Sequence, residues 1–98
     1  MPHPHPPHTA IAVPHFENER VIVTEWRFPP GTETGHHVHG HDYVVVPLTE
    51  GTLRITSEQG TTNVALALGA AYGRPAGVAH NVANPGPGEF RFVEIELK

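Results

Sequence analysis

The sequence predicts an all-β fold, a sandwich or barrel of short strands. Three observations support this prediction. The 98 residues contain no amphipathic stretch long enough for a helix. They include 10 glycines and 11 prolines at short intervals, which is typical of a chain with many turns. Segments rich in β-branched and aromatic residues recur about every ten residues, the spacing of a sandwich or barrel.

The first ten residues are expected to form a flexible arm rich in proline and histidine. Four prolines within Met1–Thr9 disfavour both a helix and a central strand. A segment of this composition buries too little surface to order itself. We therefore expect residues 11–98 to make one domain, with the modest core that this length allows.

Strands are expected where apolar segments lie between turn residues. A short strand at 11–13 should end at Pro14, which leaves His15 in a loop. A long strand at 33–48 should carry the histidines, with Pro47 marking a bulge or a sheet edge. Further strands are expected at 20–28, 52–57, 61–68, 78–84 and 90–97, with a short segment at 70–74. Alternation assigns two sets to inner faces: Ile22, Thr24, Trp26 and Phe28, and Val64, Leu66 and Leu68.

The composition argues against several classes of function. The formal net charge is −4 and only six residues are Lys or Arg, which disfavours a nucleic-acid surface. No cysteine is present, so disulfides and thiolate chemistry are excluded. Neither a signal peptide nor an apolar span of membrane length is evident, so we expect a cytoplasmic protein with no membrane partner.

One stretch, Gly35–Tyr43, contains four of the nine histidines. Successive side chains of a strand point to opposite faces, so His37, His39 and His41 should share one face and His36 the other. Two imidazoles at positions i and i+2 are close enough to bind one metal ion. The fold is expected to bring one more histidine, His80, against this strand.

Two motifs of the chain resemble those of the cupin superfamily, and in particular its small single-domain bacterial members. The second cupin motif is matched at every spacing, and the first motif is matched except at its glutamate. The matching residues are Gly69, Pro75, Gly77, His80 and Asn84 for the second motif, and Gly31, His37, His39 and Gly51 for the first. The resemblance covers roughly residues 20 to 97 and implies a double-stranded β-helix, or jelly-roll barrel, that forms a homodimer.

The resemblance also implies a metal site. His37, His39 and His80 would bind one divalent transition metal ion (Fe, Mn, Ni, Zn or Cu), while Asn84 would tie the loop after His80. The glutamate ligand of the family should fall at position 43 or 44, where this chain has Tyr43 and Val44. His41 is therefore a candidate fourth ligand. Tyr43 is the candidate catalytic residue, which could ligate, donate a proton to a substrate, or simply pack.

Three interpretations follow: an enzyme whose chemistry depends on its metal, a binding or sensing module, and a relic barrel. With iron(II), a site of three or four histidines would suit a dioxygenase-like oxidoreductase acting on a small organic molecule. With zinc, nickel or manganese, it would suit Lewis-acid chemistry such as isomerisation. The alternatives are a non-catalytic module that binds or senses a small ligand, and a relic barrel without chemistry. Arg54 and Arg74 would meet an anionic substrate if they face the barrel mouth.

Overall fold

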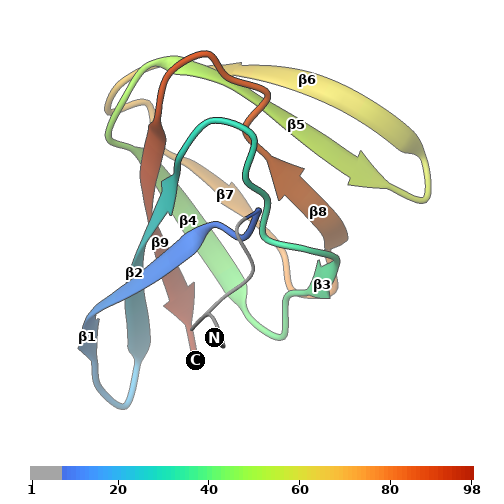
Figure 1. Cartoon of the computed structure of the whole chain (residues 1–98). Helices are drawn as coiled ribbons and strands as arrows, with labels where there is room; N and C mark the ends of the chain where they lie inside the picture. Colours follow the sequence, from blue (N-terminus) through green and yellow to red (C-terminus); the bar gives the residue numbers. More distant parts are fainter. Residues whose placement is uncertain (1–7) are drawn as a thin grey trace, which may run out of the picture.

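The computed structural model describes residues 8–98, and this part of the chain folds into nine strands without a helix (Figure 1). The all-β prediction is therefore confirmed. The strands are β1 (Ile11–Glu17), β2 (Val21–Phe28), β3 (His37–Val38), β4 (Asp42–Pro47), β5 (Gly51–Ser57), β6 (Gly60–Leu66), β7 (Tyr72–Arg74), β8 (Ala79–Ala83) and β9 (Phe90–Leu97).

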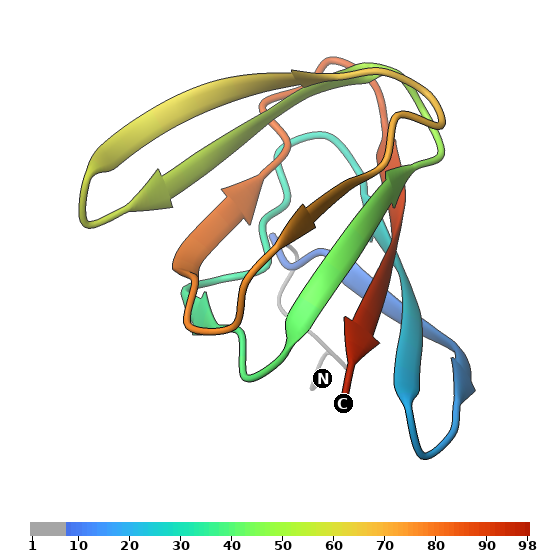
Figure 2. The ribbon, with the colours of Figure 1, turned by 180° about the vertical axis from the view of Figure 1, so that it is seen from behind.

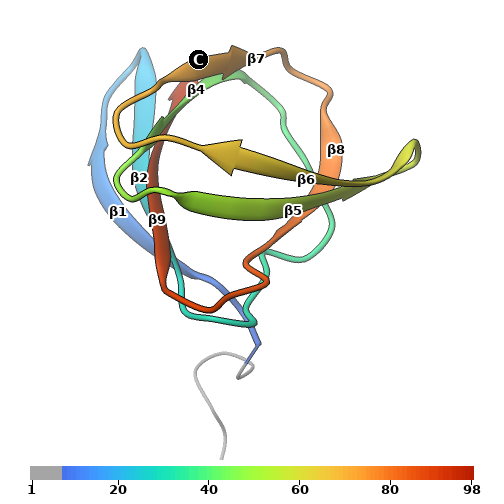
Figure 3. The same ribbon diagram turned by 90° about the horizontal axis from the view of Figure 1, so that it is seen from above.

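The strands form two antiparallel sheets that face each other. One sheet has the order β1-β2-β9-β4-β7 and the other the order β3-β8-β5-β6. Seen from behind, β4 lies between β7 and β9 (Figure 2). Seen from above, the two sheets curve around a common interior (Figure 3). This arrangement directs one face of each sheet inward, where core and site side chains meet.

The core is aromatic and lies between the sheets. Phe28 is fully buried, and its ring centroid lies 5.4 Å from that of Phe92. Trp26 packs against the same cluster. The inner face expected for β2 is therefore confirmed at its two aromatic residues. Glu25 is also buried, but on the outer face, where its carboxylate accepts a hydrogen bond from Arg27 and pairs with His15.

Two expected boundaries are wrong. The first strand continues to Glu17 because a bulge between Pro14 and Phe16 lets it keep pairing with β2, so His15 lies in a strand and not in a loop. The strand expected at 61–68 ends at Leu66, because the chain turns at Gly69, whose φ is +76°. Leu68 is consequently 62% exposed and does not join Leu66 on the inner side.

The expected long histidine strand is also wrong, because the chain passes from one sheet to the other within it. β3 pairs with β8, whereas β4 pairs with β7 and β9. Between them, His39 is held by the turn before β8: its N–H donates to Val78 and its carbonyl accepts from Gly77. The strict alternation that placed His41 with His37 and His39 ends here. Pro47 is the last residue of β4, and β4 pairs with β7 only as far as Val45. Pro47 therefore lies at an edge on that side, a position that a proline tolerates because it has no N–H to donate.

Part of the expected N-terminal arm can be described. Thr9 bridges Glu33, and Ala10 is buried and donates its N–H to the Glu33 carbonyl. His8 accepts a hydrogen bond from the Glu33 N–H. Residues 8–10 are therefore held against the barrel, while the rest of the expected arm, Met1–Pro7, lies outside the described residues.

Candidate metal centre

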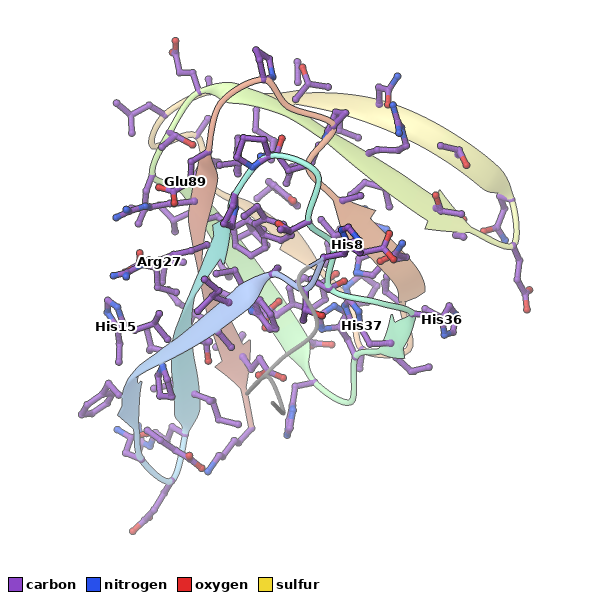
Figure 4. All side chains as sticks on the ribbon, viewed as in Figure 1. His8, His15, Arg27, His36, His37 and Glu89 are labelled. Atoms are coloured by element: carbon purple, nitrogen blue, oxygen red, sulfur yellow. The ribbon has the colours of Figure 1, made fainter. Side chains whose placement is uncertain are left out.

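Three histidines converge where β3 meets β8. His37 and His80 are direct partners across the two strands, and His39 follows at the end of β3. The Nε2 atom of His39 lies 3.0 Å from that of His37 and 3.1 Å from that of His80. His39 and His80 are buried. His36, the neighbour on the opposite face, is exposed and projects away from the barrel, unlike His37 (Figure 4).

Hydrogen bonds orient the His37 ring. Its Nδ1 donates to the Gly35 carbonyl at 2.9 Å and lies 3.2 Å from the Thr34 hydroxyl. Gly35 has a φ of +84°, a conformation that favours glycine, and its N–H donates to the Asn81 side chain. A proton on Nδ1 leaves the Nε2 lone pair free toward His39. In metal sites, such a hydrogen bond from the other ring nitrogen to a carbonyl fixes the orientation of a ligating histidine.

The three nitrogens fit a metal ion better than they fit one another. Two nitrogens at right angles on a metal, each bound at about 2.1 Å, stand about 3.0 Å apart. The distances of 3.0 and 3.1 Å match this spacing. Without a cation, neutral imidazoles cannot make both contacts hydrogen bonds when His37 is protonated at Nδ1, because the His39 Nε2 atom would have to donate to His37 and accept from His80 at once. A divalent cation would accept all three lone pairs.

The electrostatics also favour neutral ligands. Burial, together with the neighbouring His37, lowers the pKa of both His39 and His80 to about 4. Their side chains are therefore uncharged at pH 7. A neutral imidazole is the form that binds a metal, so these two residues need no deprotonation at that pH.

The two other predicted site residues lie beside this trio. The Nδ1 atom of His41 is 3.4 Å from a carboxylate oxygen of Glu96, and the ring does not belong to the convergent group. Tyr43 stacks on His39 with ring centroids 3.9 Å apart. Its buried hydroxyl has no hydrogen-bond partner within residues 8–98, and burial raises its pKa to about 12. Tyr43 therefore keeps a proton that is free to be donated.

Two carboxylates were missed by the sequence analysis. Glu94 and Glu96 on β9 each place an oxygen within 4.8 Å of a His39 ring nitrogen and of each other. Burial and then the charge of Glu96 raise the pKa of Glu94 to about 7, while a hydrogen bond from Trp26 opposes them. The alternation Phe90, Phe92, Glu94, Glu96 would have placed both on the inner face with the aromatic residues.

A cavity of about 450 Å³ opens beside the histidines. Its walls are largely apolar side chains from both sheets, among them Leu53, Ile55 and Phe92. The polar lining includes the histidine trio and six further residues: Thr34, Tyr43, Tyr72, Arg74, Glu94 and Glu96. Arg54 is not among the lining residues, since it lies on the outer side of β5. An apolar cavity with a few convergent polar groups is typical of a small-molecule site.

The loop after His80 is tied down as expected. The Asn84 amide donates to the carbonyls of Phe28 and Gly88, both at 2.8 Å, and its oxygen accepts from Gly86. Asn84 is 3% exposed. The structural role predicted for this residue is confirmed.

An all-β barrel that gathers three imidazoles beside a largely apolar cavity defines a small barrel protein with a candidate metal site. The model of the cupin domain (Cupin_2) matches residues 24–96, and the chain belongs to the cupin family. A relative from Pseudomonas aeruginosa, the beta-alanine degradation protein BauB, is 55% identical over 89 residues, which cover 91% of this chain and 94% of that protein.

Solved structures agree with this assignment. A cupin domain from Bordetella pertussis Tohama I is 56% identical, with a TM-score of 0.90 over 92% of this chain and 94% of that one. A Methanocaldococcus jannaschii RmlC-like cupin with a double-stranded β-helix fold has a TM-score of 0.76 over 92% of this chain and 81% of that one. The latter is 16% identical and supports the fold alone. The double-stranded β-helix predicted from the sequence is confirmed. Among residues 8–98, no helix has the length and apolarity needed to cross a membrane.

Proposed function

We propose that this chain is a metal-dependent oxidoreductase, dioxygenase-like, that acts on a small organic acid in its barrel cavity. The observation that carries the proposal is the convergence of three Nε2 atoms, spaced as two ligands on one metal ion would be, beside a mostly apolar cavity. His37, His39 and His80 would hold the metal. A bound iron(II) ion would supply redox chemistry toward dioxygen and leave coordination positions for a substrate.

The surrounding residues have separate tasks. The apolar walls exclude water from the reacting molecule, which strengthens the polar interactions inside the cavity. Arg74 attracts a carboxylate. Tyr43 donates a hydrogen bond from its protonated hydroxyl to the substrate and so gains the partner that it lacks within residues 8–98. The name of the Pseudomonas relative, a beta-alanine degradation protein, supports an acid derived from amino-acid breakdown as the substrate.

Oxygen consumption tests the proposal. The full-length protein, loaded with iron(II) under anaerobic conditions, is mixed with oxygen and a panel of short carboxylic acids, diketones and thiols. We expect at least one compound to be consumed together with oxygen, and the His80→Ala variant to be inactive while exposed-site His36→Ala remains active. If a compound binds tightly but is not converted, whichever metal the protein is loaded with, the result would instead favour a non-catalytic module that binds a small ligand. The homodimer and the cytoplasmic location stay predictions; light scattering tests the first.

A further inference from the structure

Charged residues of opposite sign flank Tyr43 on the inner face of the five-stranded sheet. Tyr43 on β4 is paired with Arg74 on β7 and with Glu96 on β9. Residues directly opposite one another on neighbouring strands share a face. Arg74, Tyr43 and Glu96 therefore form one row across the sheet, and their side chains all line the cavity. With neighbouring strands about 4.8 Å apart, the backbones of Arg74 and Glu96 are about 10 Å apart.

The next row adds a second carboxylate. Val45 on β4 is paired with Tyr72 and with Glu94, which is 8% exposed. An oxygen of Glu94 lies within 4.8 Å of one of Glu96. Two carboxylates at this separation repel each other, and burial strengthens the repulsion. One side of the cavity is therefore acidic, with Glu94 buried and Glu96 partly exposed.

Within the described chain, the exposed Arg74 at one end has no ion-pair partner, and the carboxylates at the other end have one. Arg74 makes no ion pair within residues 8–98. In the same part of the chain, the one ion-pair contact to the two carboxylates comes from His41, at 3.4 Å from Glu96. Between the two ends lies the Tyr43 hydroxyl, buried and without a partner in this range. A buried hydroxyl without a hydrogen bond is costly, so a ligand atom that accepts from it would relieve this cost.

We propose that the cavity binds a short amino acid in its zwitterionic form, with its ammonium group against Glu94 and Glu96 and its carboxylate on Arg74. A simple carboxylate would leave the anionic pair unrelieved, and a simple amine would leave Arg74 without a partner. The carbon chain of the bound amino acid lies along the row that contains Tyr43, and the Tyr43 hydroxyl donates a hydrogen bond to one end of the ligand. This inference rests on the proposed function, because it names the substrate class of the same cavity.

Three probes of matched size test the two ends separately. β-Alanine carries both charges, propanoate lacks the ammonium group, and propylamine lacks the carboxylate. Calorimetric titration of each into the full-length, metal-loaded protein should give a dissociation constant for β-alanine at least tenfold lower than for the other two, because each lost contact is a charge-assisted hydrogen bond. Equal affinities for all three compounds would overturn the proposal.

Isosteric variants assign the contacts. Glu94→Gln should abolish the preference for β-alanine over propanoate, and Arg74→Gln should abolish the preference for β-alanine over propylamine. The matched controls are Glu50→Gln and Arg54→Gln, at exposed positions away from the cavity lining, which should keep both preferences. Preferences that survive in both cavity variants, with thermal unfolding showing that the variants are folded, would contradict the assignment.

Metal content separates this inference from the proposed function. Arg74 is not a candidate metal ligand, so Arg74→Gln should retain its metal. Glu94 belongs with His39 and Glu96 to a second group that could hold a metal ion, so the metal content of Glu94→Gln is measured beside it. Normal metal content without any zwitterion preference defeats the amino-acid inference alone. A clear β-alanine preference in a protein that binds no metal leaves the inference standing and defeats the proposed oxidoreductase.

Discussion

At the scale of single residues, the site depends on which ring nitrogen is free. The bond from His37 Nδ1 to the Gly35 carbonyl leaves Nε2 to face His39. Burial keeps His39 and His80 neutral at pH 7. The metal-free protein therefore holds neutral imidazoles ready for a cation, and it does so at the cost of stability in acid.

This cost predicts a pH dependence in the metal-stripped protein. The folded-state pKa of His80, about 4, lies below its ordinary value of 6.5, so the unfolded chain takes up the proton first as the pH falls. Stability should therefore be lost from pH 6.5 down to about 4. Between pH 6.5 and 5, His80→Gln should remove roughly 2 kcal/mol of this loss. Urea unfolding in the presence of a chelator measures the free energy of unfolding at each pH. The proteins compared are the unsubstituted protein, His80→Gln and, as the control, His36→Gln. The same dependence of this free energy on pH in all three proteins would contradict the account.

The sequence predicted those residues whose position is set by local pattern. The paired motifs placed His37, His39 and His80 together, and the structure brings them together. Alternation misplaced His41, because the strand ends where the His39 backbone joins the turn before β8. Glu94 and Glu96 were missed because their relation to His39 depends on β9 lying beside β4, a long-range pairing that no local pattern specifies.

At the scale of elements, the site rests on two strands that the chain brings together from far apart. β3 has only two residues, and its pairing with β8 sets His37 opposite His80. β8 is in turn anchored by Asn84, whose side chain bonds to the end of β2 and to the loop before β9. The strands at 20–28 and 90–97 were well predicted because regular alternation with aromatic residues identifies them, whereas short β3 carries no such signal.

Replacement of this anchor should destabilise the barrel. Asn84→Ala removes three side-chain hydrogen bonds and leaves buried backbone groups without partners, so we expect a loss of about 2–4 kcal/mol in the free energy of unfolding. Denaturant unfolding measures the change. Asn63→Ala, at an exposed position on β6, is the matched control and should change it by less than about 0.5 kcal/mol. Similar values for the two variants would show that the anchor is unimportant.

At the scale of the whole molecule, two curved sheets enclose a cavity whose inner face is unevenly charged. The histidines enter from the β3–β8 side and the carboxylates from β9, while apolar walls lie between the sheets. Large apolar side chains also remain on the outside, among them Phe16 and Val38, at 56% and 64% exposed. They lie on different sheets, and the expected homodimer stays a prediction.

The central claim is that His37, His39 and His80 bind one metal ion, and elemental mass spectrometry tests it most directly. The protein is purified without a tag and without residues 1–8, since the histidines of that segment would bind metal nonspecifically. We expect about one equivalent of a transition metal, lost in His37→Ala and His80→Ala and retained in His36→Ala. Absence of metal from the folded protein, or equal metal content in all variants, would contradict the account.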